Sequence, residues 1–335
     1  MVNDEIMVSI CCLVYNHEKY LRKCLDGFLM QKTNFKFEVL IHDDASTDNS
    51  VQIIREYQEK YPDIIKPIYQ TENQYSKGVK ITMQYQFSRA KGKYIALCEG
   101  DDYWTDASKL QLQYECMEKN LDCSVCVHNV VKMNEEGISI NEKFPPLKYS
   151  EGIMENEVYL NDELVGVGWI FQTASYFFRN SDIQQFCKEK PEFYMESTVG
   201  DLPFMLYAIT KGKIYYIDRD MANYRMNSCF SVTKENSNNT DSWIKYAKGQ
   251  IKSLNAYDQY TNYKFHHNIE PYLLRCESGY LLATEQYAKI VKNKKYYIYM
   301  NKIGIIQSYV MTYCPFVGKC IIFLKRKICS FLNKR

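Results

Sequence analysis

Three acidic residues stand together in a segment where they are suited to chemistry. Glu99, Asp101 and Asp102 lie in ALCEGDDYW, directly after an apolar run and just before Tyr103 and Trp104. Carboxylates this close repel one another unless they point into water, share a proton or surround a cation. The segment therefore predicts either a solvated turn or a divalent metal site, and its place after a strand favours the metal site.

The first part of the chain has the pattern of a parallel α/β sheet, in which short apolar runs alternate with amphipathic stretches. We expect strands at 7–15, 37–44, 64–70 and 92–99, and helices at 18–30, 46–61 and 78–90. Open parallel sheets bind ligands beyond the carboxyl ends of their strands. Two acidic segments, HDDAS and EGDDYW, follow such strands, so we expect them to face one crevice.

The second part of the chain is expected to continue as mixed α/β structure and then to become helical. The pattern predicts a helix at 108–120, a strand at 123–131, a strand pair at 168–180, a helix from about residue 201 and a strand at 214–218. The polar segment 234–242 is typical of a linker, and residues 243–299 are typical of helices. Cys123 and Cys126 have CxxC spacing, but no second CxxC pair completes a zinc site, which favours a buried strand.

The composition excludes some classes of function. The 335 residues include 42 Lys and Arg against 40 Asp and Glu, and this net charge of +2 gives no general attraction to nucleic acid. The N-terminal sequence has no basic region followed by an apolar stretch, and the 13 cysteines are scattered, as in reduced cytoplasmic proteins. There is no glycine-rich phosphate loop. Because carboxylates repel a diphosphate, Mn²⁺ or Mg²⁺ is the expected bridge to such a ligand.

The C-terminal stretch, about residues 303–335, is apolar, and from Lys319 onward all its charges are basic. A basic amphipathic helix can lie on an anionic membrane. It can also pack on the protein with its basic face in solvent. A membrane span is the third alternative, although Pro315 and Lys319 interrupt it.

Several ordered motifs resemble one family. SICCLVYNHEKYLRKCLDGFLMQ, FEVLIHDDASTDNS and GKYIALCEGDDYW are similar to the opening of family 2 glycosyltransferases, from about residue 8 to about residue 231. The resemblance implies an inverting enzyme of the GT-A fold: an α/β domain at 1–233 with a Rossmann-like, mostly parallel sheet flanked by helices. Within it we expect a nucleotide-binding half at about 1–110 and an acceptor half at about 111–233. A helical C-terminal extension would occupy 243–335.

The resemblance also implies roles for the donor side of the site. Val14 and Tyr15 match the segment that packs on the nucleotide base, and Asp44 matches the carboxylate that accepts a hydrogen bond from the base. EGDDYW matches the DxD region, with Glu99 in place of the usual first aspartate. The metal ligands are then Asp101 and Asp102, and all three acids face the nucleotide sugar.

On the acceptor side, STVGDLPFMLYAITKGKIYYID resembles the motif in which an acidic pair opens a helix. Asp201 is the expected catalytic base, because an inverting transfer needs one carboxylate to take the acceptor's proton. NYRMNSCFSVT resembles the closing segment, which places Arg225 near the diphosphate and Asn227 where histidine is usual. Trp169 and Gln172 are expected acceptor contacts, with a packing role as the alternative.

These features together predict a hexosyl- or N-acetylhexosaminyltransferase of class EC 2.4. It would move a sugar from a UDP-sugar to a hydroxyl of a glycan or lipid-linked acceptor in cell-surface polysaccharide synthesis. We expect it in the cytoplasm, either free or at the inner face of a membrane. The alternative is a catalytically weak or inactive sugar-nucleotide-binding homologue. It stays open because, by the resemblance, Gly200 stands where many members have glutamate and Asn227 where histidine is usual.

Overall fold

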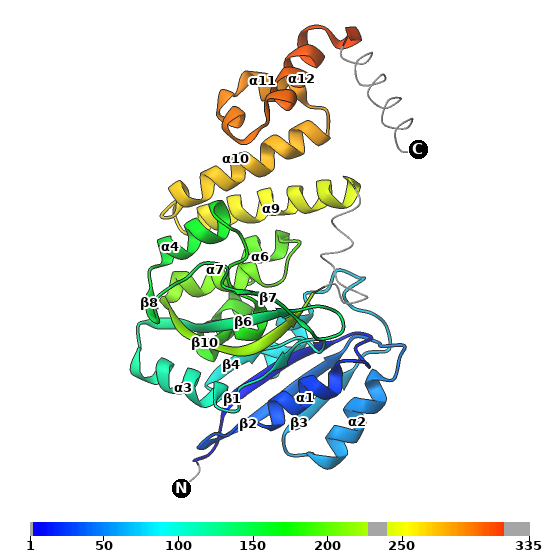
Figure 1. The fold of residues 1–335 in the computed structure, drawn as a ribbon, viewed down its shortest axis with the longest axis vertical. Coiled ribbons are helices and arrows are strands. Elements are labelled where there is room, and N and C mark those ends of the chain that lie inside the picture. Colours follow the sequence, from blue (N-terminus) through cyan, green and yellow to red (C-terminus); the bar gives the residue numbers. More distant parts are fainter. Residues whose placement is uncertain (1–2, 227–239, 318–335) are drawn as a thin grey trace. The chain divides into compact units, whose positions relative to one another are not determined.

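The computed structural model describes residues 3–226 and 240–317 (Figure 1). The chain divides into two compact units. The first comprises Met1–Met195 and Val199–Lys234, and the second comprises Glu196–Thr198 and Glu235–Arg335. The expected linker at 234–242 falls mostly outside the described residues, as does Asn227.

A sheet of ten strands forms the centre of the first unit, in the order β3-β2-β1-β4-β9-β6-β10-β5, with β7 paired to β6 and β8 paired to β10. The strands are β1 Asn3–Val14, β2 Phe35–Asp43, β3 Ile65–Tyr69, β4 Tyr94–Leu97, β5 Tyr103–Trp104, β6 Cys123–Met133, β7 Ser139–Phe144, β8 Gly152–Met154, β9 Phe177–Arg179 and β10 Lys213–Arg225. The pairs β1–β2, β1–β4 and β2–β3 are parallel, which confirms the expected parallel half. Strands β6 and β10 are also parallel, whereas β9 runs antiparallel to both β4 and β6.

Helices connect these strands. They are α1 Leu21–Leu29, α2 Ser50–Lys60, α3 Lys109–Lys119, α4 Asn156–Leu160, α5 Asn180–Glu189, α6 Glu192–Glu196 and α7 Leu202–Lys211, together with the short irregular helices η1 Thr82–Gln86, η2 Phe87–Arg89, η3 Asn161–Val165 and η4 Thr173–Ser175. Helices α1, α2, α3 and α7 lie where the sequence pattern predicts them. In α1 the buried side chains include Leu21, Leu25 and Phe28, which recur at helical spacing and face the core.

Two expected elements differ from the structure. The helix expected at 78–90 is only the pair η1 and η2, because the buried Gln86 turns inward and its amide donates to the carbonyls of Cys12 (2.7 Å) and Leu40 (3.1 Å). The strand pair expected at 168–180 is η4 followed by the single strand β9. Here Gly168 and Trp169 both have positive φ, which is incompatible with a strand.

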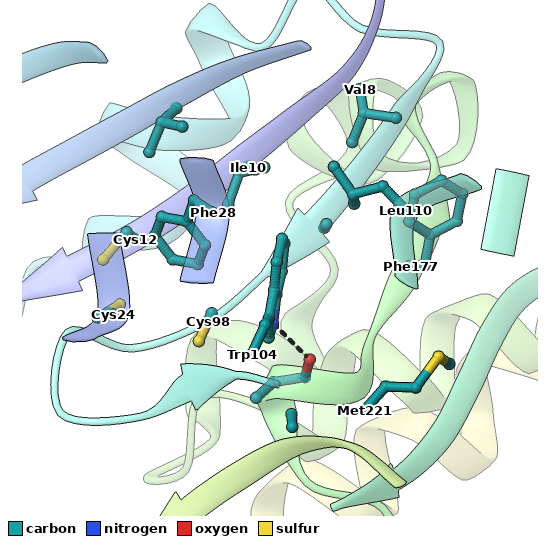
Figure 2. Packing of buried hydrophobic residues seen from close by; sticks show 14 of the residues in the cluster. Val8, Ile10, Cys12, Cys24, Phe28, Cys98, Trp104, Leu110, Phe177 and Met221 are labelled. Carbon is teal, nitrogen blue, oxygen red and sulfur yellow. Dashed lines mark hydrogen bonds between the residues drawn. The ribbon is translucent and has the colours of Figure 1, made fainter. Parts of the chain in front are cut away.

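The segment that carries the three acids is anchored in the core by Trp104. Its ring is 2% exposed and lies edge-on to Phe28 at 4.8 Å, and its indole N–H donates to the Ala174 carbonyl at 3.1 Å (Figure 2). The thiols of Cys24 and Cys98 donate to the Glu99 carbonyl from the core side (3.5 and 3.6 Å). The backbone on both sides of the acidic turn is therefore held by buried groups.

Substitution of Gly92, just before β4, is expected to lower the stability of the fold strongly. A Cβ atom at this position would lie 2.5 Å from the Ser9 nitrogen and 2.7 Å from the Val8 carbonyl carbon. Because backbone cannot move aside cheaply, Gly92→Ala should destabilise the chain by about 1–3 kcal/mol or more. Urea denaturation measures this, with Gly200→Ala as control, since no atom lies within 4 Å of a Cβ there. Equal midpoints for the two variants would contradict the packing.

The second unit is helical, as expected for residues 243–299. Its helices are α9 Thr240–Tyr260, α10 His266–Ala283, α11 Tyr287–Lys292, η5 Lys294–Tyr299 and α12 Lys302–Tyr313. Gly279 of α10 gives the Trp243 ring of α9 room, because a Cβ there would lie 2.8 Å from the ring. Of the C-terminal stretch 303–335, only residues up to 317 are described. Among described residues, no helix is both long and apolar enough to cross a membrane.

Candidate functional site

The three acids of ALCEGDDYW meet at the carboxyl end of β4. One carboxylate oxygen from each of Glu99, Asp101 and Asp102 lies within 4.8 Å of the others. The turn is held to the neighbouring strand, since the Gly100 N–H donates to the Leu13 carbonyl of β1 at 2.9 Å. The sheet edge thus gathers the acids as the sequence predicted.

Asp102 is the most buried member of the triad, at 1% exposure. Its Oδ1 accepts the backbone N–H of Arg225 at 2.9 Å, and its Oδ2 accepts the side-chain amide of Gln172 at 2.8 Å. Burial, and then the charges of Asp101 and Glu99, raise the pKa of Asp102 well above its ordinary value. Asp102 therefore joins the acidic turn to β10 and to the segment before η4.

Glu99 and Asp101 are more accessible. Glu99 keeps exposed surface but is crowded by protein atoms, and this desolvation, together with the charges of Asp101 and Asp201, raises the pKa of Glu99 to about 8. Asp101 Oδ2 lies 3.9 Å from His17 Nε2. Among the described residues, the ion pairs include no Lys or Arg partner for this triad. Its negative charge is largely uncompensated.

Arg225 lies beside the triad, but its side chain mainly binds backbone. Its Nε donates to the Asp101 carbonyl at 3.2 Å, and its Nη1 donates to the carbonyls of Asn134 (3.3 Å) and Glu135 (2.6 Å). The guanidinium also lies 4.1 Å from the centre of the Tyr20 ring. Arg225 therefore ties the loop after β6 to the acidic turn and brings a positive charge close to it.

The second acidic segment follows β2, one strand away from β4 across β1. Val14 is buried at the end of β1, and its carbonyl accepts the Asp44 N–H at 2.9 Å. The Asp44 carboxylate accepts the backbone N–H groups of Gln74 (2.7 Å) and Tyr75 (3.0 Å). Tyr15 follows Val14 and is half-buried. The ends of β1, β2 and β4 thus bring Val14, Tyr15 and Asp44 to the edge that carries the triad.

Asp201 occupies the N-cap of α7, where its Oδ1 accepts the Leu202 N–H at 2.9 Å. Burial raises the pKa of Asp201 above its ordinary value. The charge of Asp201 acts on Glu99 and also on Glu163, whose pKa is raised to about 7, first by burial. The Asp201 charge therefore acts on a member of the triad, although Asp201 follows Glu99 by about a hundred residues.

The two expected acceptor contacts differ from each other. Gln172 is 1% exposed, and its amide is occupied by Asp102 and by the Ala174 N–H (2.6 Å), so it packs inside instead of facing an acceptor. Trp169 keeps some exposure, and its ring packs against Phe144 (4.8 Å) and Tyr224 (5.3 Å). The burial of Gln172 favours the packing role that the sequence analysis gave as its alternative.

Sequence reasoning missed Glu163 and Tyr224. Glu163 accepts the backbone N–H groups of Trp169 (3.2 Å) and Ile170 (2.8 Å). The pKa of Tyr224 is raised first by burial and then by the charges of Asp102, Glu99, Asp101 and Asp201. Tyr224 is adjacent to Arg225 in the motif NYR, which was the available signal, whereas Glu163 lies in a segment without a pattern.

Other polar residues have structural roles. Cys123 and Cys126 are buried in β6, which confirms the strand interpretation of the CxxC spacing. Asp48 accepts the Ser50 N–H at the start of α2 (2.9 Å), as expected of a capping residue. Burial lowers the pKa of His42, which lies 3.5 Å from Asp44.

The triad suits a divalent metal. Its donors are all carboxylate oxygens, the ligand type that Mg²⁺ and Mn²⁺ prefer. Asp101 and Glu99 keep accessible oxygens, while each Asp102 oxygen retains a second lone pair after its one hydrogen bond. Burial, and then the repulsion between neighbouring carboxylates, raise the pKa values of Glu99 and Asp102, and a bound cation would relieve that repulsion. The described residues thus fit a cation bound by Asp101 and Asp102, with Glu99 beside it.

Comparison with known proteins agrees with this geometry. Residues 9–181 match the model of glycosyl transferase family 2. An uncharacterized protein of Mycobacterium tuberculosis is 44% identical over 142 residues, which are 42% of this chain and 40% of that protein. The chain therefore matches less than half the length of this relative.

Two solved structures share the fold at low identity. The mannosyltransferase PcManGT of Pyrobaculum calidifontis, in complex with GDP-Man and Mn²⁺, has a TM-score of 0.54 and 14% identity, over 93% of this chain and 82% of that one. S. aureus TarS 1–349 in complex with UDP-GlcNAc has a TM-score of 0.53 and 16% identity, over 83% and 81%. These similarities confirm the expected GT-A fold.

Proposed function

The chain belongs to glycosyl transferase family 2, and we propose that it moves a sugar from a nucleoside-diphosphate donor to an acceptor hydroxyl with inversion. The observation that carries this proposal is the group of carboxylates at the end of β4, with Asp201 close enough to raise the pKa of Glu99. One set of acids serves the donor and another acid serves the acceptor. An inverting transfer needs both.

On the donor side, Asp101 and Asp102 would hold Mn²⁺ or Mg²⁺, with Glu99 facing the nucleotide sugar. The metal would supply positive charge to the leaving diphosphate. Arg225 adds a fixed positive charge next to Asp101. Val14, Tyr15 and Asp44 would receive the base, because they lie at the carboxyl ends of β1 and β2.

On the acceptor side, Asp201 would take the proton of the attacking hydroxyl. Burial favours this role, since a raised pKa makes a carboxylate a stronger base near neutral pH. The donor we propose is a UDP-sugar, as bound in the TarS structure, with a hexosyl or N-acetylhexosaminyl group. The acceptor we propose is a glycan or lipid-linked glycan of the cell surface.

The direct test is release of nucleoside diphosphate from a panel of UDP- and GDP-sugars, with Mn²⁺, Mg²⁺ or EDTA. We expect metal-dependent release from at least one UDP-sugar, and loss of release in EDTA. Tight binding without release would favour the inactive homologue instead. If the protein neither binds nor cleaves any sugar nucleotide of the panel, the proposal is rejected.

The triad also predicts a pH-dependent effect of metal on stability. Without metal the folded chain holds protons on Glu99 and Asp102, whose pKa values are raised. The stability from these protons is complete below the ordinary carboxyl pKa of about 4 and is lost as the pH rises toward about 8. At a fixed concentration equal to 100 times its Kd at pH 8, Mn²⁺ should raise the melting temperature at pH 8 by roughly 5–10 °C.

The increase should be larger at pH 8 than at pH 6, because protons compete with the metal at the lower pH. Differential scanning fluorimetry with and without Mn²⁺ measures it. Asp106→Asn is the control, since Asp106 lies in the same segment but pairs with Arg219 outside the triad. An equal shift at both pH values would contradict a metal site on these residues.

We also propose that the second unit binds an anionic membrane surface, which would place the enzyme at the inner face of a cytoplasmic membrane. After Glu285 the sequence contains no Asp or Glu. One side of the α12 segment exposes apolar and aromatic side chains at helical spacing: Ile303 (65%), Ile306 (61%), Tyr309 (38%), Tyr313 (69%) and Phe316 (81%). Lysines beside an apolar helix face are typical of interfacial helices.

Cosedimentation with phosphatidylglycerol vesicles tests this surface in the full chain. Ile303→Glu with Ile306→Glu should release most of the protein, whereas Val158→Glu, at a similarly exposed position of the first unit, should not. Phosphatidylcholine vesicles should bind little wild-type protein. Unchanged sedimentation of the double variant would reject this face as the membrane contact.

A further inference from the structure

The turn that carries Trp169 is held in an unusual conformation. Gly168 has φ of 68° and Trp169 has φ of 44°, in the left-handed region that bulky residues rarely occupy. The indole Nε1 of Trp169 is buried and has no hydrogen-bond partner among the described residues. The positive φ and the unpartnered indole N–H both cost free energy, so the surrounding structure must impose them. Residues of this kind concentrate at functional sites.

Glu163 is the residue that imposes this conformation. Its Oε1 accepts the Trp169 N–H at 3.2 Å and its Oε2 accepts the Ile170 N–H at 2.8 Å, so one carboxylate holds two successive backbone groups. The preceding residue assists, because the Asp162 carbonyl accepts the Gly168 N–H at 3.0 Å. Because this one carboxyl group accepts two successive backbone N–H groups, the turn depends mainly on Glu163.

The turn lies beside the group of acids. The Trp169 ring meets the Tyr224 ring edge-on, with centroids 5.3 Å apart and an interplanar angle of 80°. Burial, and then the charges of the triad and of Asp201, raise the pKa of Tyr224. The charge of Asp201 also acts on Glu163 itself. Geometry supports this position, because Arg225, the neighbour of Tyr224, donates its backbone N–H to Asp102, as does the Gln172 side-chain amide from the segment after Trp169. Glu163, Trp169 and Tyr224 therefore form a continuous group beside the triad.

We propose that Glu163 is a positioning residue for the acceptor: it fixes the turn so that the Trp169 ring forms a wall beside Asp201 for a sugar ring. This inference rests on the proposed function. Aromatic rings suit the apolar C–H face of a pyranose, so the acceptor class is a glycoside whose ring packs on the indole. Glu163 itself touches no substrate in this scheme and acts through Trp169.

The first test observes the turn without any substrate. The full chain contains three tryptophans and can be labelled with 5-fluorotryptophan, which gives one fluorine resonance for each. Trp169→Phe assigns the resonance of interest. Glu163→Gln replaces one acceptor oxygen with a donor, so we expect the Trp169 resonance to shift and broaden while those of Trp104 and Trp243 stay in place.

The matched control is Glu38→Gln. Glu38 is buried and, like Glu163, accepts a backbone N–H, that of Lys91 at 3.0 Å, but it lies in β2 and, in the described part of the chain, makes no hydrogen bond to the turn. This variant should leave the Trp169 resonance unchanged. An unmoved resonance in Glu163→Gln, or the same change in both variants, would overturn the positioning role.

The second test separates acceptor from donor. Transfer to a panel of methyl glycosides gives the acceptor KM, and donor hydrolysis without acceptor reports the donor side. Glu163→Gln should raise the acceptor KM about tenfold, as expected for a lost hydrogen bond to a charged group. Donor hydrolysis should stay within about twofold, since the triad is unchanged.

The acceptor role would be rejected if Glu163→Gln changed donor hydrolysis as much as it changed the acceptor KM. If no variant, including the wild type, turns over any donor, the proposed function is wrong, and the acceptor role falls with it. The fluorine spectra would still decide whether Glu163 holds the turn. The two failures are therefore distinguishable.

Discussion

Replacing Asp201 with asparagine is expected to lower sugar transfer by roughly 10²- to 10⁴-fold, the usual contribution of a general base. Asparagine keeps the N-cap of α7, because its side-chain oxygen can still accept the Leu202 N–H that Asp201 binds at 2.9 Å. The loss would therefore reflect the missing base and not an unfolded helix. Donor affinity should stay close to that of the wild type.

The pH profile gives a second readout for the same residue. A base must be ionised to act, so transfer should fall as the pH drops through the pKa of Asp201. Because burial raises this pKa, the acidic limb should lie above the ordinary aspartate value of about 4. Metal occupancy must be kept saturating at each pH, so that the triad does not contribute a limb of its own.

Asp182→Asn is the matched control, since Asp182 also lies at the start of a helix, in the first turn of α5, and is half-buried. It should transfer sugar at the wild-type rate. Normal turnover by Asp201→Asn would remove Asp201 from the mechanism.

The second large effect is expected from Asp101→Asn. Both oxygens of Asp102 already accept hydrogen bonds from protein groups, whereas the Asp101 carboxylate lies 3.9 Å from His17 Nε2 and stays partly accessible. A catalytic metal contributes several kcal/mol, so transfer should fall roughly 10²- to 10³-fold. The Mn²⁺-dependent rise in melting temperature should disappear in the same variant.

Two measurements on one variant make this prediction specific. Asp106→Asn, five residues further along, should keep both the activity and the metal-dependent stabilisation, because Asp106 pairs with Arg219. Full stabilisation by Mn²⁺ in Asp101→Asn would show that the metal binds elsewhere. Comparison with Glu99→Gln would then establish whether glutamate has taken over the role of the usual first aspartate.

Local sequence was sufficient for the elements that follow a simple period. The strands β1, β2, β4 and β6 and the helices α1, α2 and α3 lie where the apolar pattern predicted them. The three acids meet at the sheet edge because the carboxyl ends of parallel strands lie side by side. A strand end followed by acids therefore carried real information about the position of the site.

Pattern was insufficient where a side chain turns inward or the backbone leaves the regular regions. Gln86 and Gln172 are polar in sequence but buried in the structure, each with its amide bonded to distant groups. Tryptophan is common in strands, but Trp169 has a positive φ. None of these properties is encoded in periodicity, because each depends on partners that folding supplies.

By itself, the sequence determined the class of the fold, the family and the place of the acidic turn, since these follow from local pattern and ordered motifs. Only the tertiary structure decided how the acids are held. Asp102 is bonded by Gln172 and Arg225, which are 70 and 123 residues away, and Glu163 accepts the backbone N–H groups of Trp169 and Ile170. The two bonds to Asp102 join the turn after β4 to the segment before η4 and to β10, and hydrogen bonds between residues so far apart in sequence exist only after the chain has folded.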